Sequence, residues 1–183
     1  MRRFSNRFWR FILFKVFGWR MIGEAPKDKK LLLVALPHTS NWDFLYGWLA
    51  VHVLDIRVKI FVKDTYFFFP INLFCKMLGV LPVNRRERTN LVDEVAKLFD
   101  EYEELSLLIA PEGTRSYKST LKSGYYHIAR AAGIPIVVAG PNYREKTFTI
   151  CPPRAPLASF EEDQAQLIAF AETQSGLRSQ DSF

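Results

Sequence analysis

From residue 31 onward, short apolar runs alternate with longer segments in which apolar residues recur at helical spacing. Short apolar runs bounded by polar or turn-forming residues are typical of buried strands. The predicted strands are Leu31–Leu36, Val58–Val62, Val80–Val83, Leu105–Ala110, Ile134–Ala139 and Phe148–Cys151. The predicted helices span 42–54, 70–78, 90–104, 120–132 and about 160–172. This alternation predicts a single α/β domain with a mostly parallel central sheet flanked by helices.

Two helix ends are marked by residue type. Gly133 follows the predicted helix 120–132, at the position where glycine commonly ends a helix. Ser159 and Glu162 have the spacing of a capping box, which predicts that the last helix begins directly after Ser159.

The first twenty residues contain many basic and aromatic residues and no acidic one. On a helix, one side would carry Phe4, Phe8, Phe11, Ile12 and Trp19. A different face would carry Arg3, Arg7 and Arg10. A helix of this kind lies in an anionic lipid interface. The same aromatic residues could instead pack on the domain, and both interpretations can hold for different faces.

We therefore divide the chain into three parts. Residues 1–22 are predicted to form a basic, aromatic, amphipathic helix at the membrane surface. Residues 23–175 form the α/β domain, and residues 176–183 form a tail that we expect to fray. No apolar run approaches the ~20 residues of a spanning helix. Because Lys15 interrupts the longest early run and no small-residue cleavage site follows, we also expect no signal peptide.

Composition narrows the classes of partner. The chain has 183 residues, of which 49% are hydrophobic and 24% charged, which excludes a disordered protein. The net charge of +6 favours anionic partners. Nucleic acid is poorly supported, because the basic residues beyond residue 20 are dispersed among acidic ones. Cys75 and Cys151 have no metal-ligand spacing and are interpreted as reduced core thiols.

His38 and Asp43 form the first candidate for chemistry. His38 follows a predicted strand, and Asp43 lies one helical turn further on, within reach of the imidazole ring. A carboxylate on one ring nitrogen raises the basicity of the other, as a general base requires. For the pair alone, a structural histidine beside a helix-capping aspartate is the favoured interpretation. A metal site lacks support, since His52 and His127 fall in the middle of predicted helices as surface or core residues.

Two further polar segments follow predicted strands. The first is the loop Glu112-Gly113-Thr114-Arg115-Ser116, whose backbone N–H groups, hydroxyls and guanidinium suit a phosphate, with Glu112 orienting Arg115 or an acceptor hydroxyl. The second segment follows the predicted strand Val80–Val83 and contains Arg85, which on its own would be interpreted as a solvated surface charge. Ligands of open α/β sheets bind beyond the carboxyl ends of the strands, so these segments and His38 are expected to meet in one crevice.

Four motifs in order resemble the lysophosphatidic-acid and glycerophosphate acyltransferase family. They are His-x4-Asp at His38–Asp43, Gly-x3-Val-x-Arg at Gly79–Arg85, Glu-Gly-Thr-Arg-Ser at Glu112–Ser116, and an apolar strand at Ile134–Val137. The segment Leu121–Gly124, with Lys122, also resembles the continuation of the third motif in that family. The first and third motifs are specific and the other two permissive. Pro82 and Val138 depart from the family pattern, and they touch the motifs that support the acceptor.

The resemblance implies an O-acyltransferase in residues 23–175. His38, oriented by Asp43, would take the proton from an acceptor hydroxyl that attacks the thioester of acyl-CoA or acyl carrier protein. The residues implied to bind substrate are Arg85, Glu112, Gly113, Thr114, Arg115, Ser116 and Lys122. No cofactor or metal is implied. The acyl chain requires an apolar channel, for which the candidates are Phe67, Phe68, Phe69, Leu73 and Phe74, although core packing also explains them.

The expected partners are therefore an anionic membrane surface, the acyl donor and a lipid acceptor such as lysophosphatidic acid. We expect a peripheral protein on the cytoplasmic face of the inner or plasma membrane. Two alternatives stay open: acylation of a different acceptor, such as a lyso aminolipid or a glycolipid, and a non-catalytic lipid-binding protein of the same fold. Hydrolysis of the thioester by water remains a conceivable side activity.

Overall fold

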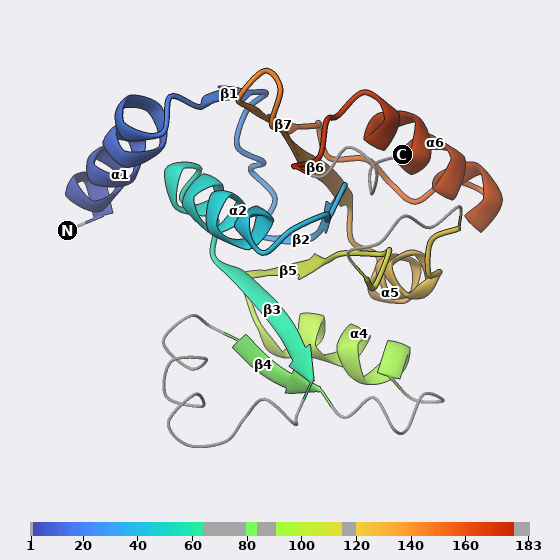
Figure 1. Ribbon diagram of the computed structural model, residues 1–183. Coiled ribbons are helices and arrows are strands. Elements are labelled where there is room, and N and C mark those ends of the chain that lie inside the picture. The colour runs from blue at the N-terminus through green and yellow to red at the C-terminus, as the bar shows by residue number, and fades with distance from the viewer. Residues whose placement is uncertain (1, 64–79, 84–90, 115–119, 178–183) are drawn as a thin grey trace.

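A computed structural model describes residues 2–63, 80–83, 91–114 and 120–177 of the chain (Figure 1). The strands are β1 Arg20–Ile22, β2 Lys30–Ala35, β3 Val58–Lys63, β4 Val80–Val83, β5 Leu105–Ile109, β6 Ile136–Asn142 and β7 Thr147–Ile150. The helices are α1 Arg2–Phe11, the π-helix η1 Ile12–Val16, α2 Trp42–Val53, α4 Leu91–Glu101, α5 Gly124–Ala132 and α6 Phe160–Glu172. The predicted helix 70–78 lies outside the described residues.

The strands form one sheet in the order β1-β7-β6-β2-β5-β3-β4. Every neighbouring pair is parallel except β6 and β7, which run antiparallel. The prediction of one α/β domain with a mostly parallel sheet and flanking helices is therefore confirmed. Five strands, from β6 to β4 in this order, point their carboxyl ends toward the same edge of the sheet, as parallel pairing requires.

Helices cover both faces of the sheet. Successive residues of a strand point to opposite faces. In β2, Leu31 and Leu33 accordingly pack with α2 and η1, whereas Leu32 and Val34 pack with α4, α5 and α6. All four side chains are at most 3% exposed, so β2 is the fully buried centre of the domain. The loop that follows β2, which contains His38, is therefore attached to a strand buried in the core.

The N-terminal helix is present but shorter than the predicted 1–22. It ends at Val16, and Gly18 follows with a φ of 71°. Residues Arg20–Ile22 instead form β1, which pairs with β7. The prediction of a helix through residue 22 was wrong because Gly18 allows a left-handed turn that a continuous helix cannot contain. Trp19 lies beyond the helix and is 3% exposed, so it belongs to the core rather than to a helix face.

Different sides of this N-terminal helix have different surroundings. Leu13 is fully buried, and the ring of Trp9 packs edge-on against Trp48 of α2. Phe8 and Phe11, in contrast, are 53% and 57% exposed. One side of the helix therefore docks on the domain, while two phenylalanines point away from it.

The remaining boundaries follow local chemistry. The hydroxyl of Ser159 accepts the backbone N–H of Glu162 at 3.2 Å, so the expected cap of α6 is confirmed. Gly133 ends α5 in the left-handed conformation, as predicted. The helix α5 begins at Gly124, four residues later than expected, because residues 120–123 are extended or turn-forming there. Within the described residues, each helix is too short or too polar to pass through a bilayer.

The expected fraying from residue 176 was wrong for the part of the tail that is described. The backbone N–H of Leu177 donates a hydrogen bond to the hydroxyl of Thr39 at 3.1 Å. Thr39 is fully buried, so this bond ties the C-terminal segment to the loop after β2. Residues 178–183 lie outside the described part of the chain.

Candidate active site

Three adjacent strands deliver polar residues to one place. His38 follows β2, Glu112 follows β5, and Tyr143 follows β6. Since β5, β2 and β6 are neighbours and parallel, their carboxyl ends lie side by side. This position, beyond the carboxyl ends of an open sheet, is where α/β proteins bind their ligands. The expectation that His38 and Glu112 meet is confirmed.

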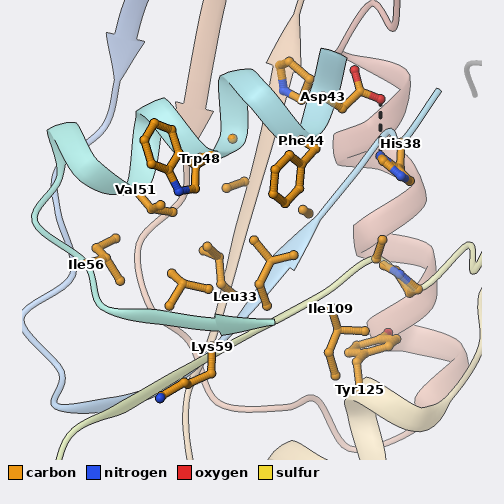
Figure 2. A pocket seen from close by; sticks show the side chains of 18 of the residues that line it. Leu33, His38, Asp43, Phe44, Trp48, Val51, Ile56, Lys59, Ile109 and Tyr125 are labelled. Carbon is orange, nitrogen blue, oxygen red and sulfur yellow. Dashed lines mark ion pairs between the residues drawn. The ribbon is translucent and has the colours of Figure 1, made fainter. Parts of the chain in front are cut away.

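The centre of the site is a histidine–aspartate pair. Nδ1 of His38 lies 3.3 Å from Oδ2 of Asp43, which Figure 2 shows as the dashed contact. The His38 side chain is 27% exposed, whereas that of Asp43 is 6% exposed. Because a carboxylate only accepts hydrogen bonds, this contact places the ring proton on Nδ1. Nε2 is then the nitrogen that can take a proton from a ligand.

Asp43 is held in place by several donors. Its Oδ2 accepts the backbone N–H groups of Thr39 and Ser40 at 2.6 and 2.7 Å, and its Oδ1 accepts the hydroxyl of Tyr143 at 2.5 Å. Burial on its own would raise the pKa of Asp43, but the hydrogen bonds from His38, Tyr143 and the two backbone groups lower it below the ordinary value. Asp43 is therefore ionised at neutral pH.

The start of α2 is stabilised by a side chain that precedes its capping residue. Asn41 occupies the capping position without a side-chain hydrogen bond. The hydroxyl of Ser40 instead accepts the backbone N–H of Trp42 at 3.0 Å. Ser40 is 5% exposed, and its hydroxyl is committed to the helix end and to Asp43, consistent with a structural role.

Glu112 contacts the loop that carries His38. Its Oε1 accepts the backbone N–H of His38 at 2.9 Å. Its Oε2 is buried and has no hydrogen-bond partner among the described residues. Burial raises the pKa of Glu112 to about 7, although the His38 N–H opposes this shift. Glu112 therefore fastens the end of β5 to His38, a role that the sequence did not indicate, and the predicted partner Arg115 lies outside the described residues.

The described part of the third motif places a cation in the lining of the cavity that His38 and Asp43 also line. Gly113 has a φ of 64°, and any side chain there would collide with the amino group of Lys122. The glycine therefore leaves room for Lys122, which lines the same cavity as His38. Thr114 follows in the same loop. The predicted substrate-binding residues Arg85, Arg115 and Ser116 lie outside the described residues.

His38 and Asp43 line a cavity of about 800 Å³ (Figure 2). From α2 it is lined by Phe44, Gly47, Trp48 and Val51, and from the strands beneath by Leu33, Ala35, Leu108 and Ile109. Further along, its lining becomes polar, with His52, Asp55, Arg57 and Lys59. A mostly apolar space of this size with a few polar groups at the end is typical of a binding site for a small molecule or a lipid chain. The predicted channel residues 67–69, Leu73 and Phe74 lie outside the described part of the chain.

Among the described residues, no three His, Cys, Asp or Glu side chains come together as metal ligands. The rings of His52, Trp9 and Trp48 contact one another, and Nδ1 of His52 lies 2.8 Å from the carbonyl oxygen of Trp48. Cys151 is a half-buried free thiol, and Cys75 lies outside the described residues.

Comparison with known proteins was made at the level of sequence and of fold. Residues 20–140 match the family model described as Acyltransferase, which spans most of the chain. The chain belongs to the acyltransferase family. The resemblance carried by the four motifs is thus confirmed, and the matched acyltransferase segment includes His38, Asp43, Glu112 and Gly113.

A relative of this acyltransferase is the 1-acyl-sn-glycerol-3-phosphate acyltransferase of Saccharomyces cerevisiae. The two are 29% identical over 126 residues, which cover 64% of this chain and 41% of the yeast protein. The chain therefore spans less than half the length of that relative. In fold it is similar to a crystal structure of the 1-acyl-sn-glycerophosphate (LPA) acyltransferase PlsC from Thermotoga maritima, with a TM-score of 0.62 and 19% identity, covering 92% of this chain and 76% of that one.

Two contacts of this acyltransferase site were missed at the level of sequence. Tyr143, which bonds Asp43 from 100 residues away, follows the fourth motif without belonging to it. Thr39, inside the first motif, was considered only as a helix cap, yet its hydroxyl accepts the N–H of Leu177. Strand order could have indicated Tyr143, since β6 lies next to β2, but strand order is not visible in one sequence.

Proposed function

We propose that this acyltransferase moves a fatty acyl group from an acyl thioester, acyl-CoA or acyl carrier protein, to a hydroxyl of a lysophospholipid such as lysophosphatidic acid. The observation that carries the proposal is the pairing of His38 with an ionised Asp43 in the wall of a large apolar cavity. Such a pair supplies a general base, and such a cavity suits a hydrocarbon chain. The names of the yeast relative and the Thermotoga structure support the choice of acceptor.

In this mechanism Nε2 of His38 takes the proton from the acceptor hydroxyl as its oxygen attacks the thioester carbonyl. The C–S bond then breaks, the ester forms, and the proton returns from His38 to the departing thiolate. Asp43 keeps the ring in the required tautomer and stabilises the transient imidazolium. No acyl-enzyme is required, because the thioester is already activated.

The acceptor headgroup is proposed to bind beside Lys122. Its ammonium lies next to Gly113, and Lys122 lines the same cavity as His38. A phosphate there would meet a cation and the glycine-rich loop of the third motif, including Thr114. Arg85, Arg115 and Ser116 remain predicted contributors. Acceptors without a phosphate would lose the attraction to Lys122.

The proposed function is tested with a panel of acceptors and donors. Lysophosphatidic acid, glycerol phosphate, lyso aminolipids and a glycolipid are each incubated with labelled acyl-CoA or acyl carrier protein, and ester products are identified by mass spectrometry. We expect ester formation and thiol release that depend on lysophosphatidic acid. Ester formation on another acceptor would move the assignment to that lipid. Thiol release without any ester would indicate hydrolysis. The absence of both thiol release and ester would contradict the proposal that the protein is an enzyme.

The cavity beneath α2 is proposed to hold the acyl chain, and Gly47 offers a test. Gly47 lies one helical turn beyond Asp43 and lines the cavity. Apart from its own helix backbone, no atom of the described residues lies within 4 Å of where a Cβ would stand. Gly47→Leu should place a side chain in the path of a long chain. If the new side chain keeps two methylene groups of the acyl chain out of the cavity, the lost apolar burial corresponds to a fall of about tenfold in kcat/KM.

We therefore expect Gly47→Leu to lower transfer from a sixteen-carbon donor by at least about tenfold, and from a four-carbon donor far less. Kinetics with both donors measure this. Gly47→Ala is the matched control, since alanine favours the helix and adds only one methyl group. An equal loss with both donors would place the acyl chain elsewhere.

The N-terminal helix is proposed to seat the enzyme on anionic membranes. Phe8, Phe11 and Val16 are 53%, 57% and 59% exposed. Arg7, Arg10 and Lys15 are exposed along the same segment. Exposed rings next to cations match the needs of a lipid interface, where the rings enter the acyl boundary and the cations meet phosphates.

Phe8→Ser combined with Phe11→Ser should weaken binding to phosphatidylglycerol vesicles by about tenfold or more, since each buried phenylalanine contributes about 1.5–3 kcal/mol. Sedimentation with vesicles measures the effect, and high salt should weaken wild-type binding by screening the cations. Tyr102→Ser is the control, because Tyr102 is a 40% exposed aromatic residue after α4, on another part of the domain. Equal loss in the control and the double variant would contradict a specific membrane face.

A further inference from the structure

Tyr143 is a half-buried residue of the candidate site that lies outside all four motifs. It follows the last residue of β6, and its hydroxyl donates to Oδ1 of Asp43 at 2.5 Å. The two residues are 100 positions apart in sequence. Oδ1 is the oxygen of Asp43 that does not face His38, because Nδ1 of His38 lies against Oδ2. Tyr143 and His38 therefore contact different oxygens of the same carboxylate.

The ring of Tyr143 is itself held by two aromatic residues. Trp19 contacts it edge-on with ring centroids 5.1 Å apart, and Tyr46 does so at 5.7 Å. Trp19 and Tyr46 also stack on one another at 4.3 Å. The backbone N–H of Tyr143 donates to the carbonyl oxygen of Ser175 at 2.8 Å. With its ring and backbone both fixed, the hydroxyl has little freedom to point elsewhere.

We propose that Tyr143 is a positioning residue for acyl transfer, which holds Asp43 so that its other oxygen orients His38. This inference rests on the function proposed above. The line of contacts runs from Tyr143 through Asp43 to the Nδ1 of His38, and leaves Nε2 directed at the substrate. An aspartate bonded on both oxygens cannot rotate away from the imidazole, and small misplacements of a general base are costly in rate.

The hydroxyl also affects the proton affinity of Asp43. A donor to a carboxylate favours its ionised form, so the Tyr143 hydroxyl lowers the pKa of Asp43, and removing the hydroxyl lets this carboxylate bind a proton more tightly. In the described chain, the titratable groups against Asp43 are His38, Tyr143 and Glu112, and Tyr46 faces Tyr143. Loss of the hydroxyl should therefore shift the acid limb of the activity profile toward higher pH.

The test is Tyr143→Phe, which removes the hydroxyl and keeps the ring between Trp19 and Tyr46. We expect kcat to fall about 10- to 100-fold, the effect of losing a hydrogen bond to a charged group, with little change in the KM of either substrate. The acid limb of the kcat profile should move to higher pH. Tyr126→Phe is the matched control, since it removes a hydroxyl that bonds Leu157 and Ala158 away from the site. An unchanged kcat and pH profile would overturn the proposal.

A double-mutant cycle separates positioning through Asp43 from a general structural effect. If Tyr143 acts through Asp43, Tyr143→Phe should cost little once Asp43→Asn is present. Full additivity of the two losses would contradict the proposal. Should Tyr143→Phe fail to fold, Tyr46→Leu removes one ring that holds Tyr143, and a lower kcat at unchanged KM is expected from it as well.

One readout is independent of catalysis. The NMR signal of the Nδ1–H proton of His38 reports its contact with Asp43, and it should shift or broaden in Tyr143→Phe relative to the wild type. A changed signal in a protein that transfers no acyl group would contradict the proposed function while supporting the contact through Asp43. An unchanged signal in an active enzyme would overturn the role of Tyr143 alone.

Discussion

Replacing His38 with alanine is expected to lower acyl transfer by ~10²–10⁴-fold, the usual effect of losing a general base. The reason is that Nε2 of His38 is the proposed proton acceptor, with Asp43 holding the opposite ring nitrogen at 3.3 Å. Mass spectrometry of the ester product and a thiol assay measure the loss. The melting temperature and vesicle binding should stay close to those of the wild type, because the ring is 27% exposed and lies away from the N-terminal helix face proposed to meet the membrane.

The matched control for this variant is His127→Ala. His127 is an exposed histidine on α5 whose side chain is not part of the described lining of the cavity. Its removal should leave transfer unchanged. A His38→Ala enzyme with near wild-type turnover would mean that another group takes the proton, and the mechanism would have to be abandoned even if the family assignment stood.

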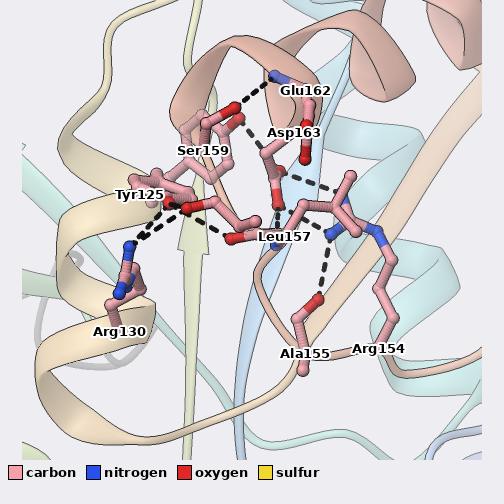
Figure 3. A network of polar contacts seen from close by, with 10 residues as sticks. Tyr125, Arg130, Arg154, Ala155, Leu157, Ser159, Glu162 and Asp163 are labelled. Atoms are coloured by element: carbon pink, nitrogen blue, oxygen red, sulfur yellow. Dashed lines mark hydrogen bonds and ion pairs between the residues drawn. The ribbon is translucent and has the colours of Figure 1, made fainter.

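Replacing Asp163 with asparagine should lower the free energy of unfolding by on the order of 2–3 kcal/mol, because Asp163 is fully buried and charge-assisted hydrogen bonds are lost, while its partner Arg154 is 24% exposed and keeps some contact with water. Asp163 is fully buried (Figure 3). Its carboxylate accepts hydrogen bonds from both terminal nitrogens of Arg154, at 2.7 and 2.9 Å. It also accepts the hydroxyl of Tyr125 and the backbone N–H of Leu157. Asparagine would leave Arg154 without a countercharge. Its side-chain NH₂ group would also face the N–H donors of Arg154 or Leu157. Urea unfolding followed by fluorescence measures the change.

The matched control is Glu161→Gln, which removes an exposed carboxylate from the same turn of α6. Its stability should change by less than about 0.5 kcal/mol. Burial alone would raise the pKa of Asp163, but the bonds from Arg154, Leu157 and Tyr125 lower it below the usual range. The contribution of Asp163 is therefore present above its unfolded-state pKa of about 3.9 and is lost as pH falls below it. A difference between wild type and Asp163→Asn that did not shrink in acid would contradict this account.

Most of the fold was predictable because its signals are local. Apolar runs gave six of the strands, and Gly133 and Ser159 marked two helix ends correctly. The strand β1 was missed since it has only three residues, two of them exposed, and exists through its pairing with β7. Such a strand depends on a partner more than a hundred residues away, so its own residues carry little signal.

The site was predictable where its residues lie close in sequence. His38 and Asp43 are five positions apart, and a helical turn brings them together. Glu112 was placed correctly near His38, but its bond to a backbone N–H depends on the pairing of β2 with β5. The cavity could not be predicted, because it arises from how α2 packs over the sheet rather than from any residue pattern.

The anchoring of the loop after β2 bears on how short a folded fragment of this domain can be. The segment that matches the family model ends at residue 140. Tyr143 bonds Asp43 and Leu177 bonds Thr39, and both lie beyond that limit. A protein trimmed to the family match would contain every motif residue and yet lack two of the supports of the loop that carries His38. Expression of this domain, or its transplantation into a chimaera, should therefore extend through Leu177.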